Sequence, residues 1–432
     1  MRRLAALLLA ALFLLPAPPI GAQGSAETDA TALLREAYVF IQEYALRRPD
    51  PQALLTSALT AVEGQLASTG APPSLTGDEA ADLETAALYL AATVRGLAPA
   101  RADLVLGAAL RAMVQVLDDT QAAIFPPEEF AEYLQGLRGQ HAGIGVQVHA
   151  SAGVTVISDV TPGGPAARAG LLAGDALVEI NGQPTTGRTP DRILDALHGR
   201  PGTVVTVVAQ RATAMIRLTL TREVVRESPV RFALIDSRVA YLRLLEFSRD
   251  SSPDVGRALA ALRHRGAQAL LLDLRRNTGG LVDESVGVAS FFLHDGIVAM
   301  EERRGGLVPL NVKPVQPFPG PVVVLVDGLT ASAGEIVAGA LQDAGAPLVG
   351  LTTYGKATVQ SVSIPPLPKG WGIRVTTARY YTRQGRMVEG RGLRPDVVVP
   401  MSAELIQSSR DQQLHQAIIQ ARLRLSARAG GR

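Results

Sequence analysis

Three successive patterns of apolar residues constrain how this chain of 432 residues can fold. Residues 29–117 are rich in Ala and Leu, and apolar side chains such as Leu83 and Ala87 recur there at helical spacing. From Gly143 short alternating strands are separated by Gly- and Pro-rich turns, and from Val239 strands alternate with helices. The sequence therefore predicts a multi-domain α/β protein in which a helical region precedes a β-rich module and an α/β core.

The changes of pattern divide the chain into five predicted regions. In chain order, these are a signal peptide at 1–22, a helical region at 23–135, the β-rich module at 140–225, the α/β core at 226–400 and a helical tail at 401–432. A chain of this length is long enough to bury a substantial core in more than one domain.

The N-terminus has the composition of an export signal. Arg2 and Arg3 precede an apolar run from Leu4 to Leu15, and small residues follow up to Ala22. This run is too short to span a bilayer, which requires roughly 20 apolar residues. We therefore expect cleavage near Ala22 and a mature protein that works outside the cytoplasm, in the periplasm or another extracytoplasmic space, either soluble or loosely associated with the membrane. An uncleaved N-terminal anchor is the alternative.

The composition excludes several kinds of site. The chain has no cysteine, which rules out disulfides, thiolate catalysis and cysteine-bound metals. Its net charge is only +2 and its aromatic content is 4%, so we expect no nucleic-acid partner. None of its histidines lies in a recognisable catalytic or zinc-binding motif, and we expect neither a metal nor an organic cofactor. These histidines are His141, His149, His198, His264, His294 and His415.

The scarcity of lysine draws attention to one residue. Only three of the 42 basic residues are lysine, and one of them is Lys356, which follows Tyr354 and Gly355. Arginine stays protonated in proteins, whereas a buried lysine can lose its proton and act as a base. Ser332 lies 24 residues before Lys356. Because a neutral lysine can activate a serine nucleophile for acyl transfer, this pair is a candidate catalytic dyad.

Both residues also have simpler interpretations. Ser332 and Glu335 precede an apolar helix with the spacing of a capping box, so Ser332 would serve as an N-cap. That role is compatible with a nucleophile because the N-terminus of a helix favours a developing negative charge. Lys356 by itself would be interpreted as a solvated loop cation. To act as a base it must be neutral, which requires a buried position that lowers its pKa.

Five motifs add a family resemblance to this local reasoning. They are Gly143-Ile144-Gly145-Val146, the segment from Leu272 to Leu281, the segment from Ser332 to Asp343, Tyr354-Gly355-Lys356, and Gly392-Leu393-Arg394-Pro395-Asp396. With these motifs in this order, the chain resembles the carboxy-terminal processing proteases, also called tail-specific proteases, from about Leu110 to Pro400. The resemblance implies a PDZ domain within a serine–lysine peptidase whose core is a crotonase-like ββα spiral.

The chain departs from the family pattern without losing a reacting group. The interval between Ser332 and Lys356 is one residue shorter than is typical of the family. The residues that differ are Thr278, Gly334, Tyr354 and Ala357, where the family usually has Pro, Ser, Phe and Gly.

The resemblance implies roles for six site residues. They are the nucleophile Ser332, the general base Lys356, the orienting side chain Gln360, and the oxyanion-stabilising amides of Ala333 and of Gly279 or Gly280. Without the resemblance, Gln360 would be an ordinary strand residue, and Gly279-Gly280 would be a tight strand-to-helix turn.

The β-rich module carries the predicted peptide-binding site. The resemblance implies that its loop amides capture a C-terminal carboxylate while the peptide adds a strand to the edge of the sheet. The residues assigned to this site are Gly143, Ile144, Gly145, Val146, Ile193 and Leu197. The alternative is that the apolar residues among them belong to the core of a small barrel. The expected partners are protein or peptide substrates with exposed apolar C-termini, and the N-terminal helices are a candidate surface for self-association or adaptor binding.

These observations predict an exported serine endopeptidase that cleaves proteins near their C-terminal tails and forms an acyl-enzyme on Ser332. The alternative is a catalytically idle protein that keeps the PDZ and peptidase folds for binding or scaffolding. An enzyme of acyl-CoA chemistry on a similar spiral core is disfavoured by the β-rich module and the export signal.

Overall fold

The computed structural model describes residues 26–65, 71–151, 154–188, 190–226, 228–402, 405–406 and 410–430. The predicted export signal at residues 1–22 lies outside this set. The described residues form two compact units. One unit contains the residues up to Val39 and Asp50–Met113, and the other contains Phe40–Pro49 and the residues from Val114 onward.

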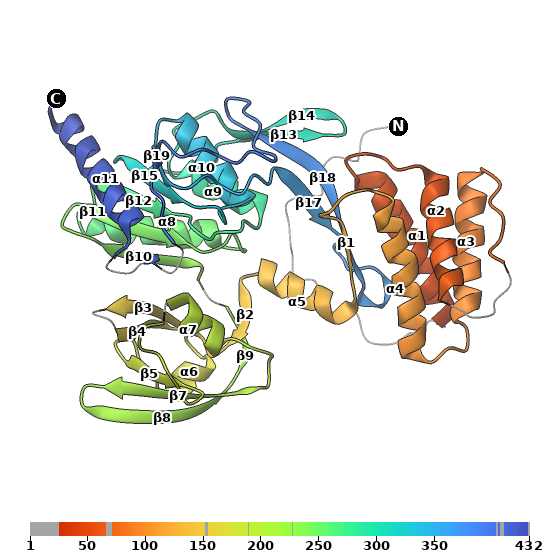
Figure 1. Ribbon diagram of the computed structural model, residues 1–432, viewed down its shortest axis with the longest axis horizontal. Coiled ribbons are helices and arrows are strands. Elements are labelled where there is room, and N and C mark those ends of the chain that lie inside the picture. The colour runs from red at the N-terminus through yellow and green to blue at the C-terminus, as the bar shows by residue number, and fades with distance from the viewer. Residues whose placement is uncertain are drawn as a thin grey trace. The chain divides into compact units, whose positions relative to one another are not determined.

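Helices make up most of the N-terminal unit (Figure 1). They are α1 (Ala26–Tyr44), α2 (Pro51–Gly64), α3 (Glu79–Val94) and α4 (Pro99–Gln115). Asp50 and Asp78 act as N-caps of α2 and α3, because their carboxylates accept main-chain N–H groups of the first turn. The helices pack through small and branched apolar side chains, including the buried Leu55, Ala87 and Leu90.

The β-rich module centres on an antiparallel sheet. Its elements are β2 (Gln140–Gly143), β3 (Val146–Ser151), β4 (Val154–Val160), α6 (Pro165–Arg168), β5 (Ala176–Ile180), β6 (Gln183–Pro184), α7 (Pro190–Leu197), β7 (Val204–Arg211), β8 (Ala214–Thr221) and β9 (Glu223–Arg226). The strand order is β3-β4-β5-β7-β8 with β6 paired to β5, while β2 and β9 pair separately. Strand β3 therefore lies at an edge of the sheet, and α7 packs against it.

The α/β core is built on a six-stranded sheet in the order β10-β11-β12-β15-β16-β19. Its elements are β10 (Val230–Leu234), β11 (Val239–Leu244), α8 (Ser251–His264), β12 (Ala269–Asp273), α9 (Val282–Ser290), β15 (Val322–Val326), α10 (Ala333–Asp343), β16 (Leu348–Gly350), β19 (Val397–Val398) and α11 (Gln412–Gly430). Neighbouring strands are parallel except β10, which runs antiparallel to β11. The loops after β12 and β15 therefore leave the same edge of the sheet, and these loops carry Gly279 and Ser332.

Alternating side chains of the central strands reach opposite faces of this sheet. Leu270 and Leu272 of β12 join a core that also contains residues of α8, α9 and α10. Leu271, between them, packs on the other face with Ala417 and Ala421 of α11. Because both faces are covered, these strands are almost entirely apolar, as is typical of buried parallel sheets.

A second sheet contributes the lysine side of the candidate site. Its strands are β1 (Ala123–Phe125), β13 (Ile297–Arg303), β14 (Gly306–Asn311), β17 (Thr358–Val362) and β18 (Gly372–Thr382). The long strand β18 pairs with β1, β17 and β13 along different parts of its length. The short helices α5 (Pro127–Leu137) and η1 (Pro368–Gly370) complete the described elements.

The predicted fold class is confirmed, with a helical N-terminal region, a β-rich module and an α/β core. Individual elements differ from the sequence interpretation. The β13–β14 hairpin was not predicted, because its Glu- and Arg-rich sequence lacks a clear apolar alternation. The sequence predicts a helix near Val282–Leu293, whereas α9 ends at Ser290, because the N–H groups of Phe291 and Phe292 donate to carbonyls only three residues back.

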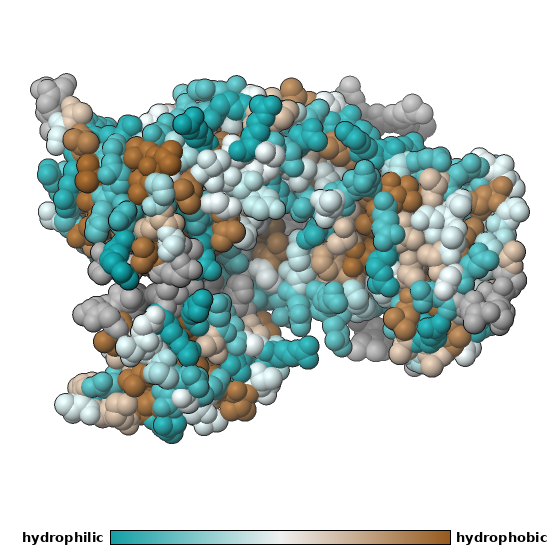
Figure 2. All heavy atoms as spheres, viewed as in Figure 1, coloured by the Kyte–Doolittle hydropathy of each residue, from teal (hydrophilic) through white to brown (hydrophobic). Residues whose placement is uncertain are grey.

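The surface of the described residues is mixed. On the face shown in Figure 2, hydrophobic residues form small separate groups among hydrophilic ones. Among the helices that the structure describes, none combines the length and the apolar character that a bilayer crossing would require.

Candidate active site

Ser332 lies at the N-terminus of α10, directly after the loop that follows β15. Its backbone has φ 53° and ψ −120°, a conformation that non-glycine residues seldom adopt. Such a conformation persists only when the surroundings hold it in place. Asn277 holds the residue before Ser332 in place, because its main-chain carbonyl accepts the N–H of Ala331 at 2.9 Å. Backbone strain of this kind is often found at functional sites, and it coexists here with the position of Ser332 as the N-cap of α10.

Glu335 connects the serine segment to the lysine segment. This side chain is completely buried, and it accepts the main-chain N–H of Ser332 at 3.1 Å. It also accepts the N–H groups of Gly355 at 2.8 Å and Lys356 at 2.9 Å, and the hydroxyl of Thr353 at 2.5 Å. Burial raises the pKa of Glu335, and these four donors oppose the rise. The predicted capping contact between Glu335 and Ser332 is thus one part of a larger tertiary junction.

Lys356 lies in the loop between β16 and β17 and is partly buried. Its Nζ donates to Oε1 of Gln360 at 2.6 Å. The Gln360 amide is itself oriented, because its Nε2 donates to the hydroxyls of Thr358 at 2.9 Å and Thr376 at 3.3 Å. The spacing of four residues brings Gln360 back to Lys356 across a register shift between Val359 and Gln360.

The surroundings of Lys356 lower its pKa. Burial is the largest cause, and the positive charge of Arg374 adds to it. The carboxylates of Glu389, Asp119 and Glu335 act in the opposite direction without reversing the shift. The guanidinium of Arg374 lies over the rings of Phe125 and Tyr133, and its Nε donates a hydrogen bond to the carbonyl of Gln121. A lowered pKa is the electrostatic property that a lysine base requires.

The two glycines of the predicted oxyanion site occupy different positions. A side chain on Gly279 would lie only 2.8 Å from Cβ of Ser332, so this glycine permits a close approach to the serine. The N–H of Gly279 donates to Oδ1 of Asn277 at 2.9 Å. Gly280 pairs with Phe247 in a parallel β-bridge. The N–H of Phe247 donates to the carbonyl of Gly279, and the N–H of Leu281 donates to the carbonyl of Phe247. The N–H of Gly280 consequently points away from Phe247.

A cavity of about 430 Å³ opens beside Lys356. It is lined by Ala45, Leu46, Arg47, Leu117, Asp118, Asp119, Thr120, Gln121, Tyr354, Gly355, Lys356, Thr358, Thr376, Arg379 and Glu389. The N–H of Leu46 donates to the carbonyl of Thr376 at 2.8 Å, and the Asp119 carboxylate accepts the N–H of Thr376 at 3.1 Å. The segments around Leu46 and Asp119, which lie far from Lys356 in the sequence, therefore form one wall of this cavity.

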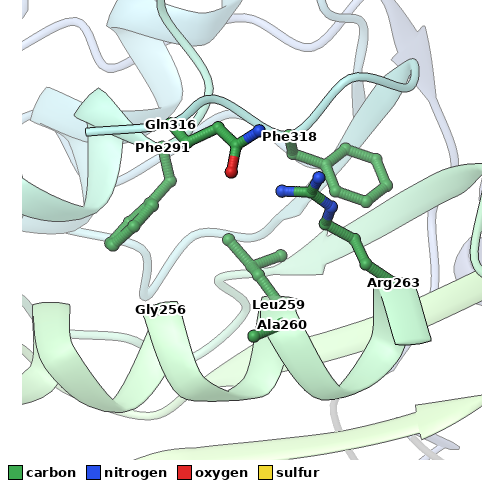
Figure 3. Close-up of a pocket in the computed structure, with 7 residues that line it drawn as sticks. All are labelled: Gly256, Leu259, Ala260, Arg263, Phe291, Gln316 and Phe318. Atoms are coloured by element: carbon green, nitrogen blue, oxygen red, sulfur yellow. The ribbon is translucent and has the colours of Figure 1, made fainter. Parts of the chain in front are cut away.

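A second cavity lies elsewhere in the core and carries no comparable chemistry. It measures about 160 Å³ and is lined by Gly256, Leu259, Ala260, Arg263, Phe291, Gln316 and Phe318 (Figure 3). Its walls come from α8 and from Phe291, Gln316 and Phe318. None of the residues proposed for the dyad contributes to these walls.

The residues predicted for peptide binding are largely inside the β-rich module. Ile144, Val146, Ile193 and Leu197 are each at most 1% exposed and belong to one hydrophobic core. Gly145 has φ 74°, which lets the loop between β2 and β3 turn toward α6. These four apolar side chains support the core of the module in this conformation, as the alternative interpretation expected.

Several residues of the site were not identified from the sequence. Glu335 was considered only as a cap, while Asn277, Thr358, Thr376 and Arg374 carried no local signal. Glu335, Asn277, Thr376 and Arg374 have partners in other segments of the chain, so only the tertiary structure identifies them. Thr358 lies only two residues from its partner Gln360. Within the described part of the chain, no cluster of His, Asp and Glu residues has the arrangement of a metal site.

Comparison with known proteins gives two domain matches. Residues 238–399 match the model of peptidase family S41, and residues 156–211 match the model of the PDZ domain. The first range contains Gly279, Ser332, Lys356 and Gln360. The second lies within the β-rich module.

Known proteins are similar over much of the chain. The carboxyl-terminal-processing protease of a Picosynechococcus species is 33% identical over 297 residues, which cover 67% of this chain and 71% of that protein. The carboxyl-terminal-processing protease of a Synechocystis species is 35% identical over 301 residues, which cover 67% and 70%. A solved structure from Bacteroides fragilis, grouped with the S41 proteases, has a TM-score of 0.51 at 18% identity and covers 89% of this chain and 96% of that one. The structural similarity concerns the fold alone.

Proposed function

This chain belongs to peptidase family S41, and on that basis we propose that it is an exported serine endopeptidase that cleaves proteins at their C-terminal tails with a Ser332–Lys356 dyad. The observation that carries the proposal is the environment of Lys356. Its Nζ contacts a neutral amide oxygen rather than a carboxylate, and burial lowers its pKa. The neutral form of this amine is therefore easier to reach than in water, in the segment that Glu335 connects to Ser332.

The proposed reaction proceeds through an acyl-enzyme. Oγ of Ser332 attacks the scissile carbonyl carbon while Nζ of Lys356 accepts the hydroxyl proton. The tetrahedral intermediate collapses as Lys356 transfers that proton to the leaving amine, and the C–N bond breaks. Water then attacks the serine ester with Lys356 again acting as the base, and the new carboxylate leaves as Ser332 regains its proton. Gln360 holds the lysine throughout.

The negative charge of the intermediate requires donors near Ser332. The N–H of Ala333 is the first amide of α10, where the helix dipole favours negative charge. Because the N–H of Gly279 is already bonded to Asn277, the N–H of Gly280 is the second donor in this proposal. The loss of one such donor typically costs about 10²–10³ in rate.

The β-rich module supplies tail recognition in this proposal. Strand β3 is the terminal strand of the sheet in the described residues and lies beside α7, an arrangement to which an extended peptide can add as a further strand. The loop from Gly143 to Val146 precedes that strand and would present its main-chain amides to the terminal carboxylate. The expected substrates are unstructured tails that end in an apolar residue and a free carboxylate.

The proposed site of action is outside the cytoplasm, because residues 1–22 have the composition of an export signal. N-terminal sequencing of the protein from fractionated cells tests this. A mature N-terminus near Ala22 in the extracytoplasmic fraction is expected, and intact cytoplasmic protein would contradict it.

Peptide cleavage tests the catalytic proposal. The purified protein is incubated with a peptide that has an apolar free C-terminus, and the products are identified by mass spectrometry. We expect cleavage that is lost in Ser332→Ala and Lys356→Arg, survives replacement of the histidines, and weakens when the terminal carboxylate is amidated. Binding of the peptide without cleavage would instead support the idle scaffold, and full activity of Lys356→Arg would exclude the proposed base.

A further inference from the structure

The hydroxyl of Tyr380 contacts both segments of the proposed dyad. Tyr380 lies on β18, outside the serine and lysine loops, and its side chain is only 1% exposed. Its Oη lies 3.1 Å from the carbonyl oxygen of Ser332 and 3.0 Å from the carbonyl oxygen of Lys356. The two carbonyl oxygens are therefore no more than about 6 Å apart, although 24 residues separate them in the sequence.

This contact complements the one made by Glu335. The Glu335 carboxylate accepts the N–H groups of Ser332 and Lys356, whereas the Tyr380 hydroxyl faces the carbonyls of the same two residues. Each of the two residues is thus held at its N–H by Glu335 and at its carbonyl by Tyr380. Such double attachment explains how Ser332 keeps its strained backbone conformation.

Tyr380 is itself fixed in a rigid element. Its N–H donates to the carbonyl of Ala357 at 2.8 Å, and its strand neighbour in β13 is Glu301. The ring packs in the same hydrophobic core as Ala333 and Ala357. Burial also raises the pKa of Tyr380 well above its ordinary value, so the hydroxyl keeps the proton that it donates.

We infer that Tyr380 is a positioning residue that sets the separation of Ser332 and Lys356 by bridging their main-chain carbonyls. The inference rests on the proposed function, because it assigns Tyr380 to the geometry of that dyad. Tyr380 touches neither the substrate nor the reacting atoms in this role. A shift on the order of 1 Å in such a pair can cost about 10²-fold in rate, so even one hydrogen-bonding group is important here.

The test compares two neighbouring tyrosines. Tyr380→Phe removes only the bridging hydroxyl and keeps the ring in its core position. Tyr381→Phe is the matched control, because its hydroxyl donates to Glu302 at 2.7 Å, away from the dyad. Steady-state cleavage gives kcat and KM for both variants, the rate of labelling by a fluorophosphonate reports the reactivity of Ser332, and thermal melting reports stability.

We expect kcat of Tyr380→Phe to fall by roughly 10- to 100-fold, with KM changed by less than about threefold. Labelling of Ser332 should slow in parallel, while Tyr381→Phe should behave like the wild type. A lower melting temperature with kcat and labelling unchanged would assign Tyr380 a purely structural role and overturn the inference. A change in KM alone would overturn it as well.

The same experiment separates this inference from the proposed function. If the wild type cleaves peptides through Ser332 and Tyr380→Phe matches it, only the inference fails. If the wild type neither cleaves nor reacts with the fluorophosphonate, the proposed function fails, and the inference fails with it.

Discussion

Arg275 and Lys356 are two basic residues of the peptidase core whose surroundings shift their pKa values in opposite directions. Arg275 is completely buried, and its guanidinium donates hydrogen bonds to Asp273, Asp411 and Gln413. Burial by itself would lower the pKa of Arg275, but the carboxylates of Asp273 and Asp411 raise it. The same pairing lowers the pKa of Asp273 against the effect of its own burial. The ion pair therefore favours the charged forms of both Arg275 and Asp273.

Lys356 is less deeply buried, and yet its pKa falls. Its Nζ contacts the neutral amide of Gln360, and the positive charge of Arg374 adds to the effect of burial. Direct hydrogen bonding to carboxylates, rather than depth of burial, thus decides the direction in which the pKa of each cation shifts. The residue types agree with this division, because arginine cannot serve as a base at any ordinary pH.

The largest expected effect is on activity at Lys356. Both Lys356→Met and Lys356→Arg should reduce kcat/KM by about 10⁴-fold or more, since neither side chain can accept the proton of Ser332. Stability should respond differently. The folded pKa lies below the unfolded value of 10.5, so the unfolded state binds more protons between the two values and stability rises with pH in that window.

Lys356→Met should abolish that pH dependence and be at least as stable as the wild type at pH 7. Denaturant titrations at several pH values measure this, with Lys369→Met at an exposed turn as the control. A marked loss of stability in Lys356→Met would mean that the ammonium is a paired structural cation like Arg275.

The second effect concerns the buried cluster. Arg275→Met leaves Asp273 and Asp411 without their cation, and we expect a loss of about 3–5 kcal/mol in the free energy of unfolding. Urea denaturation measures it. The variant in which Asp273→Asn and Asp411→Asn accompany Arg275→Met should recover part of the loss. If Arg275→Met costs less than about 1 kcal/mol, the cluster does not need its cation and the contrast with Lys356 disappears.

The third effect is a pair of opposite shifts in the pH profile. Arg374→Gln removes a charge that lowers the pKa of Lys356, so the acidic limb of kcat/KM should move to higher pH. Glu389→Gln removes a charge that raises it, so the limb should move to lower pH. Initial rates across the pH range give both values. Shifts of the same sign in the two variants would show that Lys356 does not control this limb.

The smallest effect is expected at an exposed ion pair. Arg422 lies 2.8 Å from Asp236, and both side chains remain accessible to water. The Arg422 guanidinium and the N–H groups of Arg238 and Val239 lower the pKa of Asp236 to about 2. Its stabilisation is therefore present above pH 3.8 and is lost as the pH falls toward 2.

Arg422→Gln should cost less than about 1 kcal/mol at neutral pH, because solvent screens the pair. Thermal melting at neutral and acidic pH measures it, with Arg424→Gln as the control. A cost comparable to that of Arg275→Met would show that exposure does not weaken ion pairs in this core.

The candidate dyad could be proposed from the sequence because the signals of its two segments are local. The rarity of lysine singled out Lys356 and the helix-start pattern singled out Ser332, whereas Gln360 was assigned through the family resemblance alone. The sequence did not identify Glu335 or Tyr380 as connecting residues. Apart from the contact between Glu335 and Ser332, their connecting hydrogen bonds span 18 to 48 residues, beyond the reach of helical or strand periodicity.

By itself, the sequence determined the order of the regions, the fold class and the residue types available for chemistry, because apolar periodicity and composition act over short stretches of chain. Only the tertiary structure decided whether the pKa of each buried cation rises or falls. Arg275 forms hydrogen bonds with Asp411, which lies 136 residues away in the sequence. The positive charge of Arg374 on β18 lowers the pKa of Lys356. Electrostatic energies depend on distance and on exclusion of water, and neither is fixed until remote segments pack together.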